Sequence, residues 1–321
     1  MMSKLGTAML ILAIGLLFAV LASLVPSDFW LLRTVDLVRE PLSYFASALL
    51  VVSLFAGGKG RWLTIGVLGL VIVINVWRIW PYSFLAETQV ALTQPNDETP
   101  GRQCFKAMSI NVKVENQRYK LTADQIRSED PDLLFLMETD ERWIESLEPV
   151  LSAYSHVVRH PQPKAFGLVF ATKLPVLKSN VVENTYRDTP TLYATLESAG
   201  SGPIEFIGLH PKPPLPEWNT ELRDENIVNA GLQTPDSLPD ALVMGDFNDV
   251  PWSRTTTRFR ETGEWRDPRI GRGTYPTFPS SLLALGWPLD HIMLKGSLRL
   301  QSFDVLPDNG SDHRGMMAII C

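Results

Sequence analysis

Basic residues are scarce at the start of this chain. Only six of its 29 lysines and arginines precede residue 101, and most of the first eighty residues are apolar. Cysteine is scarce throughout, and two copies permit one disulfide at most. No internal repeat or low-complexity tract occurs, which argues against a repeat architecture. The length suits one large domain with an appendage.

Three apolar runs fill this region, which is poor in charge. They cover Leu5–Val25, Pro41–Gly58 and Trp62–Trp80. Each run alone could be a buried core helix, but a soluble domain of eighty residues could not cover three of them. Their lengths match the thickness of a bilayer, and the last ends with aromatic and basic residues typical of an interfacial anchor. We therefore predict a three-helix transmembrane region at 1–86, with spans at about 5–25, 41–58 and 62–80.

The basic residues between the runs bear on topology. Lys4, Lys59 and Arg61 would be cytoplasmic with three spans, against Arg33 and Arg39 outside. The first run also has features of a cleaved signal peptide, although its apolar core is longer than usual. With two or three spans, residues 100–321 are expected on the non-cytoplasmic side.

A polar stretch at 87–102, rich in proline, reads as a linker to a domain at 103–321. Short apolar runs in that domain alternate with amphipathic stretches, which indicates an α/β fold. Strands are predicted at 104–111, 132–138, 167–172, 191–196, 204–210, 241–246, 289–295 and 315–320. Helices are predicted near 119–129, 140–150 and 217–232, and a Thr122–Gln125 capping box could begin the first of them.

The stretch from Leu242 to Pro251 is the most informative in the chain. It reads as a buried strand that ends at Gly245, followed by Asp246 and Asn248. Residues two apart on an extended chain point to the same side, so the acid and the amide would converge. Such a pair can hold a metal, a water or a phosphate, although a strand followed by an Asx turn is the simpler reading.

Polar residues also stand at the ends of the other predicted strands. Each has an ordinary structural explanation, such as capping a turn or starting a helix. Six such positions in this order are harder to dismiss. They are Asn111, Glu138, His210, Gly245–Asn248, Asp290 and Gly310–Gly315, which contains Asp312 and His313.

This set resembles the endonuclease/exonuclease/phosphatase superfamily over nearly all of residues 103–320. The strongest pieces are Gly245-Asp246-Phe247-Asn248 and Ser311-Asp312-His313. The resemblance implies a four-layer sandwich, in which two packed mixed β-sheets are flanked by helices and the site lies at one edge. A trio of membrane helices before such a domain resembles a bacterial membrane-anchored subgroup. The expected location is then the bacterial inner membrane.

The resemblance implies a role for each residue of the set. Glu138, with Asp312 and Asn111, would hold Mg²⁺, with Mn²⁺ as an alternative, because hard cations prefer oxygen ligands. His313, oriented by Asp290, and Asp246 would share the activation of water. His210 would donate to the charge that develops on phosphorus, and Asn248 and Asn111 would hold phosphate oxygens.

One position departs from the family pattern. Several family nucleases have an acid two residues after the first Asn, where this chain has Lys113, so one metal is expected rather than two. Lys113 could contact a substrate phosphate or be an exposed strand lysine. Cys104 opens the first predicted strand and Cys321 ends the last, so they could pair if these strands are neighbours. Two unpaired thiols are the alternative.

The sequence does not identify a single substrate. Residues beyond 100 have 23 Lys and Arg against 29 Asp and Glu, an acidic balance that does not favour nonspecific DNA binding. Six arginines between 254 and 272 could bind phosphate or form a solvated face. Three aromatic residues precede Asp290 in the chain, namely Tyr275, Phe278 and Trp287. They could line a binding site or pack within a loop.

Three functions fit these observations. The first is a membrane-anchored, metal-dependent hydrolase of phosphoesters, whose substrate could be a nucleic acid, a phospholipid or a small phosphodiester. The second is an extracytoplasmic nuclease. The third is a noncatalytic membrane protein on the same fold, which the complete set of polar positions disfavours. The bilayer is one expected partner, and the sequence identifies no protein partner.

Overall fold

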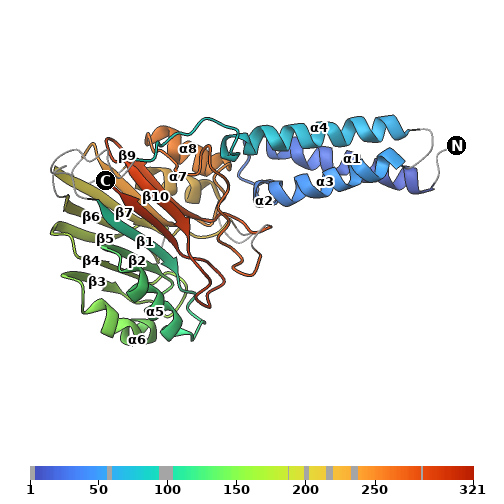
Figure 1. The fold of residues 1–321 in the computed structure, drawn as a ribbon. Helices are drawn as coiled ribbons and strands as arrows, with labels where there is room; N and C mark the ends of the chain where they lie inside the picture. The colour runs from blue at the N-terminus through green and yellow to red at the C-terminus, as the bar shows by residue number, and fades with distance from the viewer. Residues whose placement is uncertain are drawn as a thin grey trace.

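The computed structural model shows a rod of helices attached to one end of a β-sandwich (Figure 1). It describes residues 4–55, 60–93, 104–186, 188–198, 202–214, 220–232, 238–282 and 285–321. The rod consists of α1 (Lys4–Ser23), α2 (Trp30–Leu37), α3 (Arg39–Phe55) and α4 (Arg61–Ile79), followed by the short 3₁₀ helix η1 (Trp80–Tyr82).

Two mixed sheets form the sandwich. The first has the order β10-β11-β1-β2-β4-β3, and the second has the order β5-β6-β7-β8-β9. In the first sheet β1 and β2 are parallel, and in the second β7 and β8 are parallel. The strands are β1 (Phe105–Asn111), β2 (Leu133–Met137), β3 (His156–His160), β4 (Leu168–Thr172), β5 (Val176–Tyr186), β6 (Thr189–Ser198), β7 (Gly202–Leu209), β8 (Ala241–Asp246), β9 (Asp290–Lys295), β10 (Leu300–Val305) and β11 (Met316–Ile320).

Apolar side chains from both sheets meet in the main core. Phe170 of the first sheet stacks on Phe206 of the second at 5.0 Å between ring centroids, and Phe135 meets Phe206 edge-on at 5.8 Å. A side chain at Gly208 would lie 2.5 Å from the Phe135 ring, so only glycine fits there. Burial of these rings holds the two sheets together.

Helices cover both outer faces. On the first sheet lie α5 (Tyr119–Glu129) and α6 (Glu141–Leu151), and on the second lie α7 (Thr220–Leu232) and α8 (Arg254–Thr262). Asp140 caps α6 by accepting a hydrogen bond from Trp143 N, and Ser253 caps α8 by accepting one from Thr256 N. The predicted four-layer α/β sandwich is confirmed.

The eight strands predicted from the sequence are all present, with ends that differ by no more than two residues. The strands β3, β5 and β10 and the helices α2 and α8 were not predicted. The capping-box prediction was wrong, because α5 begins at Tyr119 and Thr122 is buried within it. Of the third predicted helix, residues 217–219 lie outside the described part, and α7 begins at Thr220.

A disulfide joins the first and last strands of the sandwich. β1 and β11 are antiparallel neighbours, with Phe105 opposite Ile320. The residues just outside this pair, Cys104 and Cys321, are therefore opposite each other and are bonded. The alternative of two unpaired thiols was wrong.

Two helical segments are each long and apolar enough to cross a membrane, namely α1 and Arg61–Tyr82. The helices α2 and α3 meet that criterion only as a pair, and they are bent by 70° at their junction. The predicted second span at 41–58 corresponds to α3, whose last residue is Phe55, and residues 56–58 lie outside the described part. The rod thus has two candidate spans, or three with the bent pair.

The start of the predicted linker lies against the sandwich. Val90 is buried in the main core, and Thr93 N donates to Leu300 O at 2.7 Å. Gln89 Oε1 accepts a hydrogen bond from Asp267 N. Residues 94–102 lie outside the described part of the chain.

Candidate active site

Five strand ends bring the predicted site residues to one edge of the sandwich. Asn111 is the last residue of β1, Glu138 follows β2, and His210 follows β7. Asp246 ends β8 and Asp290 begins β9, while Asp312 and His313 lie in the segment before β11. Because β1 and β2 are parallel, with Asn111 opposite Met137, the amide and the carboxylate of Glu138 emerge side by side.

The side chain of Asn111 links the two sheets at this edge. Its Nδ2 atom donates to Glu138 Oε1 at 2.8 Å and to Asp246 Oδ2 at 3.1 Å. Its Oδ1 atom accepts from Lys113 N at 3.0 Å. Glu138 has a φ of 61°, a left-handed conformation that is unusual for a glutamate. Such strain is most often retained where it orients a functional group.

Asp246 is held deep in the site by a close approach of β8 to β7. Gly245 has a φ of 151°, and a side chain there would lie 1.8 Å from Leu209 O. The carboxylate that follows is buried, and burial raises its pKa, although the charge of His313 opposes the shift. His210 Nε2 lies 3.7 Å from Asp246 Oδ2.

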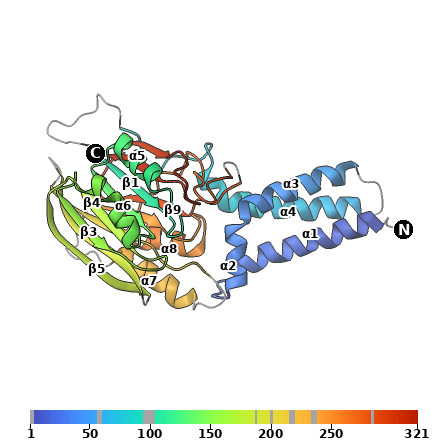
Figure 2. The same ribbon diagram turned by 90° about the horizontal axis from the view of Figure 1, so that it is seen from below.

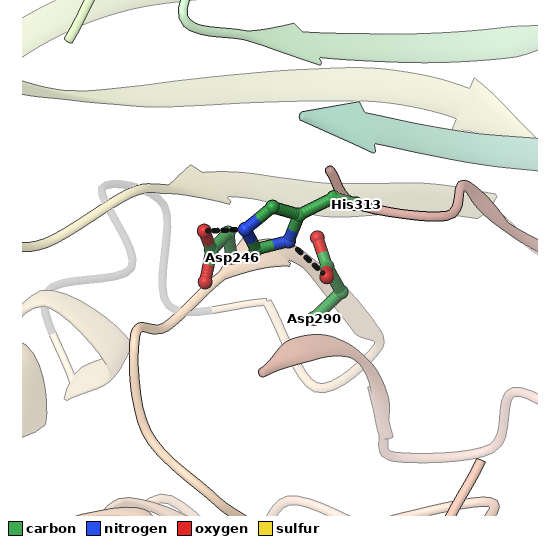
Figure 3. A group of neighbouring side chains, drawn as sticks. All are labelled: Asp246, Asp290 and His313. Atoms are coloured by element: carbon green, nitrogen blue, oxygen red, sulfur yellow. Dashed lines mark hydrogen bonds and ion pairs between the residues drawn. The ribbon is translucent and has the colours of Figure 1, made fainter. Parts of the chain in front are cut away.

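The imidazole of His313 lies between two buried carboxylates (Figure 3). Its Nδ1 is 2.8 Å from Asp290 Oδ2, and its Nε2 is 3.6 Å from Asp246 Oδ2. Burial favours the neutral ring, but Asp290 and Asp246 outweigh it and raise the pKa of His313 to about 10. The ring is therefore an imidazolium at neutral pH.

Asp246, Asp290 and His313 offer ligand atoms that all lie within 4.8 Å of one another. This spacing alone would suit a metal. An imidazolium, however, has no free lone pair for a metal, and both ring nitrogens here face carboxylates. The arrangement is better explained as an ion-paired triad than as a metal centre.

The oxygen atoms around Glu138 fit a hard divalent cation better. Burial raises the pKa of Glu138, and within the described part of the chain its carboxylate accepts from the Asn111 amide and, at 3.4 Å, from Val114 N. Among the described residues no basic side chain forms an ion pair with it. A desolvated carboxylate of this kind is stabilised by a bound cation. Asp312 is close enough to raise the pKa of Glu138 further.

Lys113 pairs with Asp312 at the outer side of this group. The two atoms, Lys113 Nζ and Asp312 Oδ2, lie 2.8 Å apart, and both side chains are partly exposed. Lys113 follows β1 in a left-handed conformation, with a φ of 58°. Lys113 is therefore not a strand residue, because β1 ends at Asn111, although its side chain is 40% exposed.

Asn248 joins the loops that follow β7 and β8. Its backbone N–H donates to Asp246 Oδ1 at 2.8 Å, and its Nδ2 donates to Pro211 O at 3.0 Å. His210 is buried against Phe166, and burial lowers the pKa of its imidazole. At neutral pH His210 is thus uncharged and can donate one N–H.

One of the three aromatic residues ahead of Asp290 reaches the site. The Phe278 ring lies 4.8 Å from the His313 ring and stacks on Trp287 at 5.8 Å. Tyr275 instead packs on Phe303 at 5.0 Å. Phe278 therefore lies at the site with Trp287 stacked on it, while Tyr275 packs a loop.

The six arginines of 254–272 do not form one patch. Arg269 is fully buried and paired with Asp267 at 2.8 Å. Arg266 donates to Leu298 O at 2.7 Å, and Arg272 donates to Val90 O. The other three, Arg254, Arg258 and Arg260, belong to α8.

Two supporting residues, Ser311 and Arg223, were given no role from the sequence. Ser311 Oγ donates to Asn111 O at 2.7 Å and accepts from His313 N at 3.1 Å, which fixes the segment before β11. Arg223 of α7 donates to Lys212 O, and to Phe247 O at 3.1 Å. Ser311 could have been recognised from its position beside Asp312, but no local pattern marks Arg223.

Comparison with known proteins agrees with this geometry. The model of the endonuclease/exonuclease/phosphatase family matches residues 108–313, and the chain belongs to that family. No curated protein matches the sequence.

Solved structures with the same fold cover 68% of this chain. A phosphatase from Bacteroides thetaiotaomicron, described as a mannosyl-6-phosphatase, has a TM-score of 0.55 at 15% identity over 99% of its own chain. The human Nocturnin catalytic domain with bound sulfate has a TM-score of 0.55 at 19% identity over 97% of its chain. TDP2 from D. rerio, in complex with a single-strand DNA product, has a TM-score of 0.54 at 14% identity over 99% of its chain. At these identities the likeness shows the fold alone.

Proposed function

We propose that this protein is a membrane-anchored, divalent-metal-dependent hydrolase of phosphoester bonds. The observation that carries the proposal is the contact chain from Glu138 through Asn111 and Asp246 to His313, which joins an oxygen-rich cation site to a charged triad. Hydrolysis of a phosphoester needs both parts, since charge develops on the phosphoryl oxygens while water is activated.

Glu138, with Asp312 and Asn111, would hold the cation, which we take to be Mg²⁺ or Mn²⁺. When bound, this ion would polarise the phosphoryl group and stabilise the leaving oxygen. The few protein oxygens leave room for coordinated water, as Mg²⁺ prefers. Lys113 neutralises part of the remaining negative charge, which favours one ion over two.

Asp246 is the better candidate for the base that accepts the proton of the attacking water. Its pKa is raised by burial, which makes it more basic than an exposed carboxylate. His313 is already protonated at neutral pH and would bind a phosphoryl oxygen as a cation. Asp290 would keep it charged, and His210, a neutral donor, would assist from the other side of Asp246.

Asn248 would contribute mainly by positioning the groups around the substrate. Its side-chain amide donates to Pro211 O, so it fixes the rim of the site, and its remaining N–H is available to a phosphate oxygen. Both N–H groups of the Asn111 amide are already donated, to Glu138 and to Asp246, so its proposed contact with a phosphate oxygen requires one of them to be released. Asn111 therefore holds the two acids in place, and Asn248 holds Asp246 through its backbone N–H.

We place the catalytic domain on the non-cytoplasmic face of the inner membrane. The disulfide between Cys104 and Cys321 supports this placement, because such bonds persist in oxidising compartments. A C-terminal fusion to alkaline phosphatase should then be active in cells, and a matching fusion to green fluorescent protein should be dark. The opposite pattern would contradict the placement.

The test of the activity uses the full chain in detergent, with bis-p-nitrophenyl phosphate as substrate. We expect Mg²⁺-dependent release of p-nitrophenol that is lost in Glu138→Gln and in His313→Ala. The matched controls are Glu145→Gln, an exposed acid of α6, and His160→Ala, on the edge strand β3. A wild-type protein with no turnover on any phosphoester of a broad panel would favour the noncatalytic alternative. A panel of DNA, RNA and phospholipids would separate the nuclease alternative.

A further inference from the structure

A pocket of about 370 Å³ lies where the helical rod meets the sandwich. Its walls are the end of α1 and the segment after it, α2, the last turn of α4, and α8. Figure 2 shows that α1 and α4 run side by side and both end at the domain side of the rod. The pocket is separate from the active site, because none of the proposed catalytic or metal residues lines it.

The charged side chains of the pocket are mainly basic. Arg33, Arg78, Arg254 and Arg258 line it, against the acids Asp36 and Glu261. Asp36 is already paired with Arg39. Of the four arginines, Arg33 pairs with Asp224 and Arg254 lies 3.6 Å from Asp28. Arg78 and Arg258 form no ion pair within the described part of the chain, and these two supply the positive charge that suits an anion.

Three guanidinium nitrogens at this junction are buried and have no hydrogen-bond partner among the described residues. They are Arg33 Nε, Arg78 Nε and Arg254 Nη1. The side chain of Arg33 is only 6% exposed. Buried donors are normally paired, so three unpaired nitrogens on residues that line one pocket leave hydrogen-bonding capacity at this junction that an acceptor would use.

The same three arginines are fixed by their other nitrogens. Arg33 Nη2 lies 3.0 Å from Asp224 Oδ2, and Arg78 Nη2 donates to Trp252 O at 2.7 Å. Arg254 Nη2 lies 3.6 Å from Asp28 Oδ1. Guanidinium groups that are held in this way are prepared to bind phosphate, whose oxygens accept several N–H groups at once.

The pocket lies at the depth expected for lipid headgroups. The 20 residues of α1 extend about 30 Å, the thickness of the hydrocarbon layer, and the pocket begins at its last residue, Ser23. On α4 the exposed residue Trp77 neighbours Arg78. The exposed residue Trp80 begins the 3₁₀ helix η1, which follows α4 directly. Aromatic residues of this kind mark the membrane interface.

We propose that this junction pocket binds the phosphate group of an anionic membrane lipid. The inference rests on the proposed function only in that α1 and α4 span a bilayer, and it does not depend on hydrolysis. Inorganic phosphate has the same chemistry, so the experiment must separate the two sources. The lipid is favoured because the pocket is lined by Ser23, the last residue of α1, and by Arg78, in the last turn of α4.

The test measures lipid retention by native mass spectrometry of the full chain in neutral detergent. The probes are phosphatidylglycerol, phosphatidylcholine and inorganic phosphate. The main variant is Arg254→Gln/Arg258→Gln, since both arginines are at least partly exposed and can be replaced without opening the core. The matched control is Arg61→Gln, at the far end of α4.

We expect one phosphatidylglycerol to be retained in preference to phosphatidylcholine, with the affinity at least tenfold lower in the double variant and unchanged in Arg61→Gln. The catalytic variant Glu138→Gln should retain the lipid like the wild type, so loss of hydrolysis and loss of lipid binding are separable. Equal retention in the wild type and the double variant would overturn the proposal. Retention of inorganic phosphate with no preference for phosphatidylglycerol would show that the phosphate group in the pocket does not come from a lipid.

Discussion

The Nδ1 atom of His313 lies 2.8 Å from Asp290 Oδ2, and both side chains are buried. Histidine in water loses its proton near neutral pH, but here two carboxylates raise the pKa to about 10. The site therefore contains a permanent cation at neutral pH, next to a carboxylate that can accept a proton. This pairing underlies the division of roles that we propose between His313 and Asp246.

Replacing Asp290 with Asn should lower the pKa of His313, because it removes one of the two charges that hold the proton. In the wild type we expect hydrolysis to decline only as the pH approaches 10, when the imidazolium deprotonates. In Asp290→Asn that alkaline decline should move to lower pH, and the maximal rate should fall roughly 100-fold. Rates measured from pH 6 to 10.5 check this, with Asp304→Asn on β10 as the control. An unchanged profile would argue against the charged His313.

The same proton should make stability depend on pH. The folded-state pKa of His313 is raised to about 10, above its value in the unfolded chain of about 6.5. Its contribution is then complete below about pH 6.5 and is lost as the pH rises toward 10. In detergent, the unfolding midpoint should fall more steeply over this window for the wild type than for His313→Gln. Parallel curves would contradict the assignment.

Replacing Lys113 with Met should increase the affinity for Mg²⁺. The lysine places a positive charge 2.8 Å from Asp312, beside the proposed cation site. Without that charge the concentration of Mg²⁺ that gives half-maximal activity should fall roughly three- to tenfold, since a nearby like charge repels the ion. Lys120→Met is the matched control, because Lys120 also pairs with an aspartate but lies on α5. A higher Mg²⁺ requirement would show that Lys113 organises the site instead.

Removal of the disulfide should destabilise the domain. Cys104 and Cys321 are 217 residues apart, so the bond restricts a very long loop in the unfolded chain. We expect Cys104→Ser/Cys321→Ser to lower the free energy of unfolding by roughly 3 to 5 kcal/mol. The chain has two cysteines in all, so a reducing agent should lower the wild-type midpoint and leave the double variant unchanged. A wild type that is insensitive to reduction would contradict the bond.

The contact between rod and sandwich should contribute to stability near the active site. Arg33 of α2 lies 3.0 Å from Asp224 and 3.6 Å from Asp249, and all three side chains are buried. Arg33→Met would leave both buried carboxylates to Arg223, which lies 2.6 Å from Asp224 and 3.7 Å from Asp249, so we expect a loss of about 1 to 3 kcal/mol. Chemical denaturation in detergent measures the loss, with the exposed Arg142→Met as the control. A change below about 1 kcal/mol would show that the pair is not important.

The strand ends of the site were predictable because each has a local signal. Gly245 before Asp246 marks a close approach of the backbone, and Glu138 stands at the end of a fully apolar run. The periodicity of the sequence therefore placed most strands and the acids that follow them. The resemblance to a family, and not a local pattern, predicted that these acids form one site. The structure agrees, because the Asn111 amide contacts both Glu138 and Asp246.

The elements that were not predicted lack such signals. β3 has mixed burial without clean alternation, and α8 is a short polar helix with three arginines. The bend between α2 and α3 had no local signal either, and the contacts of α2 with the sandwich, from Arg33 to Asp224 and from Trp252 Nε1 to Asp36 O, join segments distant in the chain. Arg223 could not be recognised either, because its contacts exist only after the two loops fold together.

The most direct test of the account is the binding of Mg²⁺ to the full chain, compared between the wild type and Glu138→Gln. Isothermal titration calorimetry in detergent should show one Mg²⁺ site in the wild type, with hydrolysis that depends on its occupancy. In Glu138→Gln both the binding and the hydrolysis should be lost, while Glu145→Gln keeps them. Hydrolysis that persists in Glu138→Gln with unchanged Mg²⁺ binding would contradict the central claim.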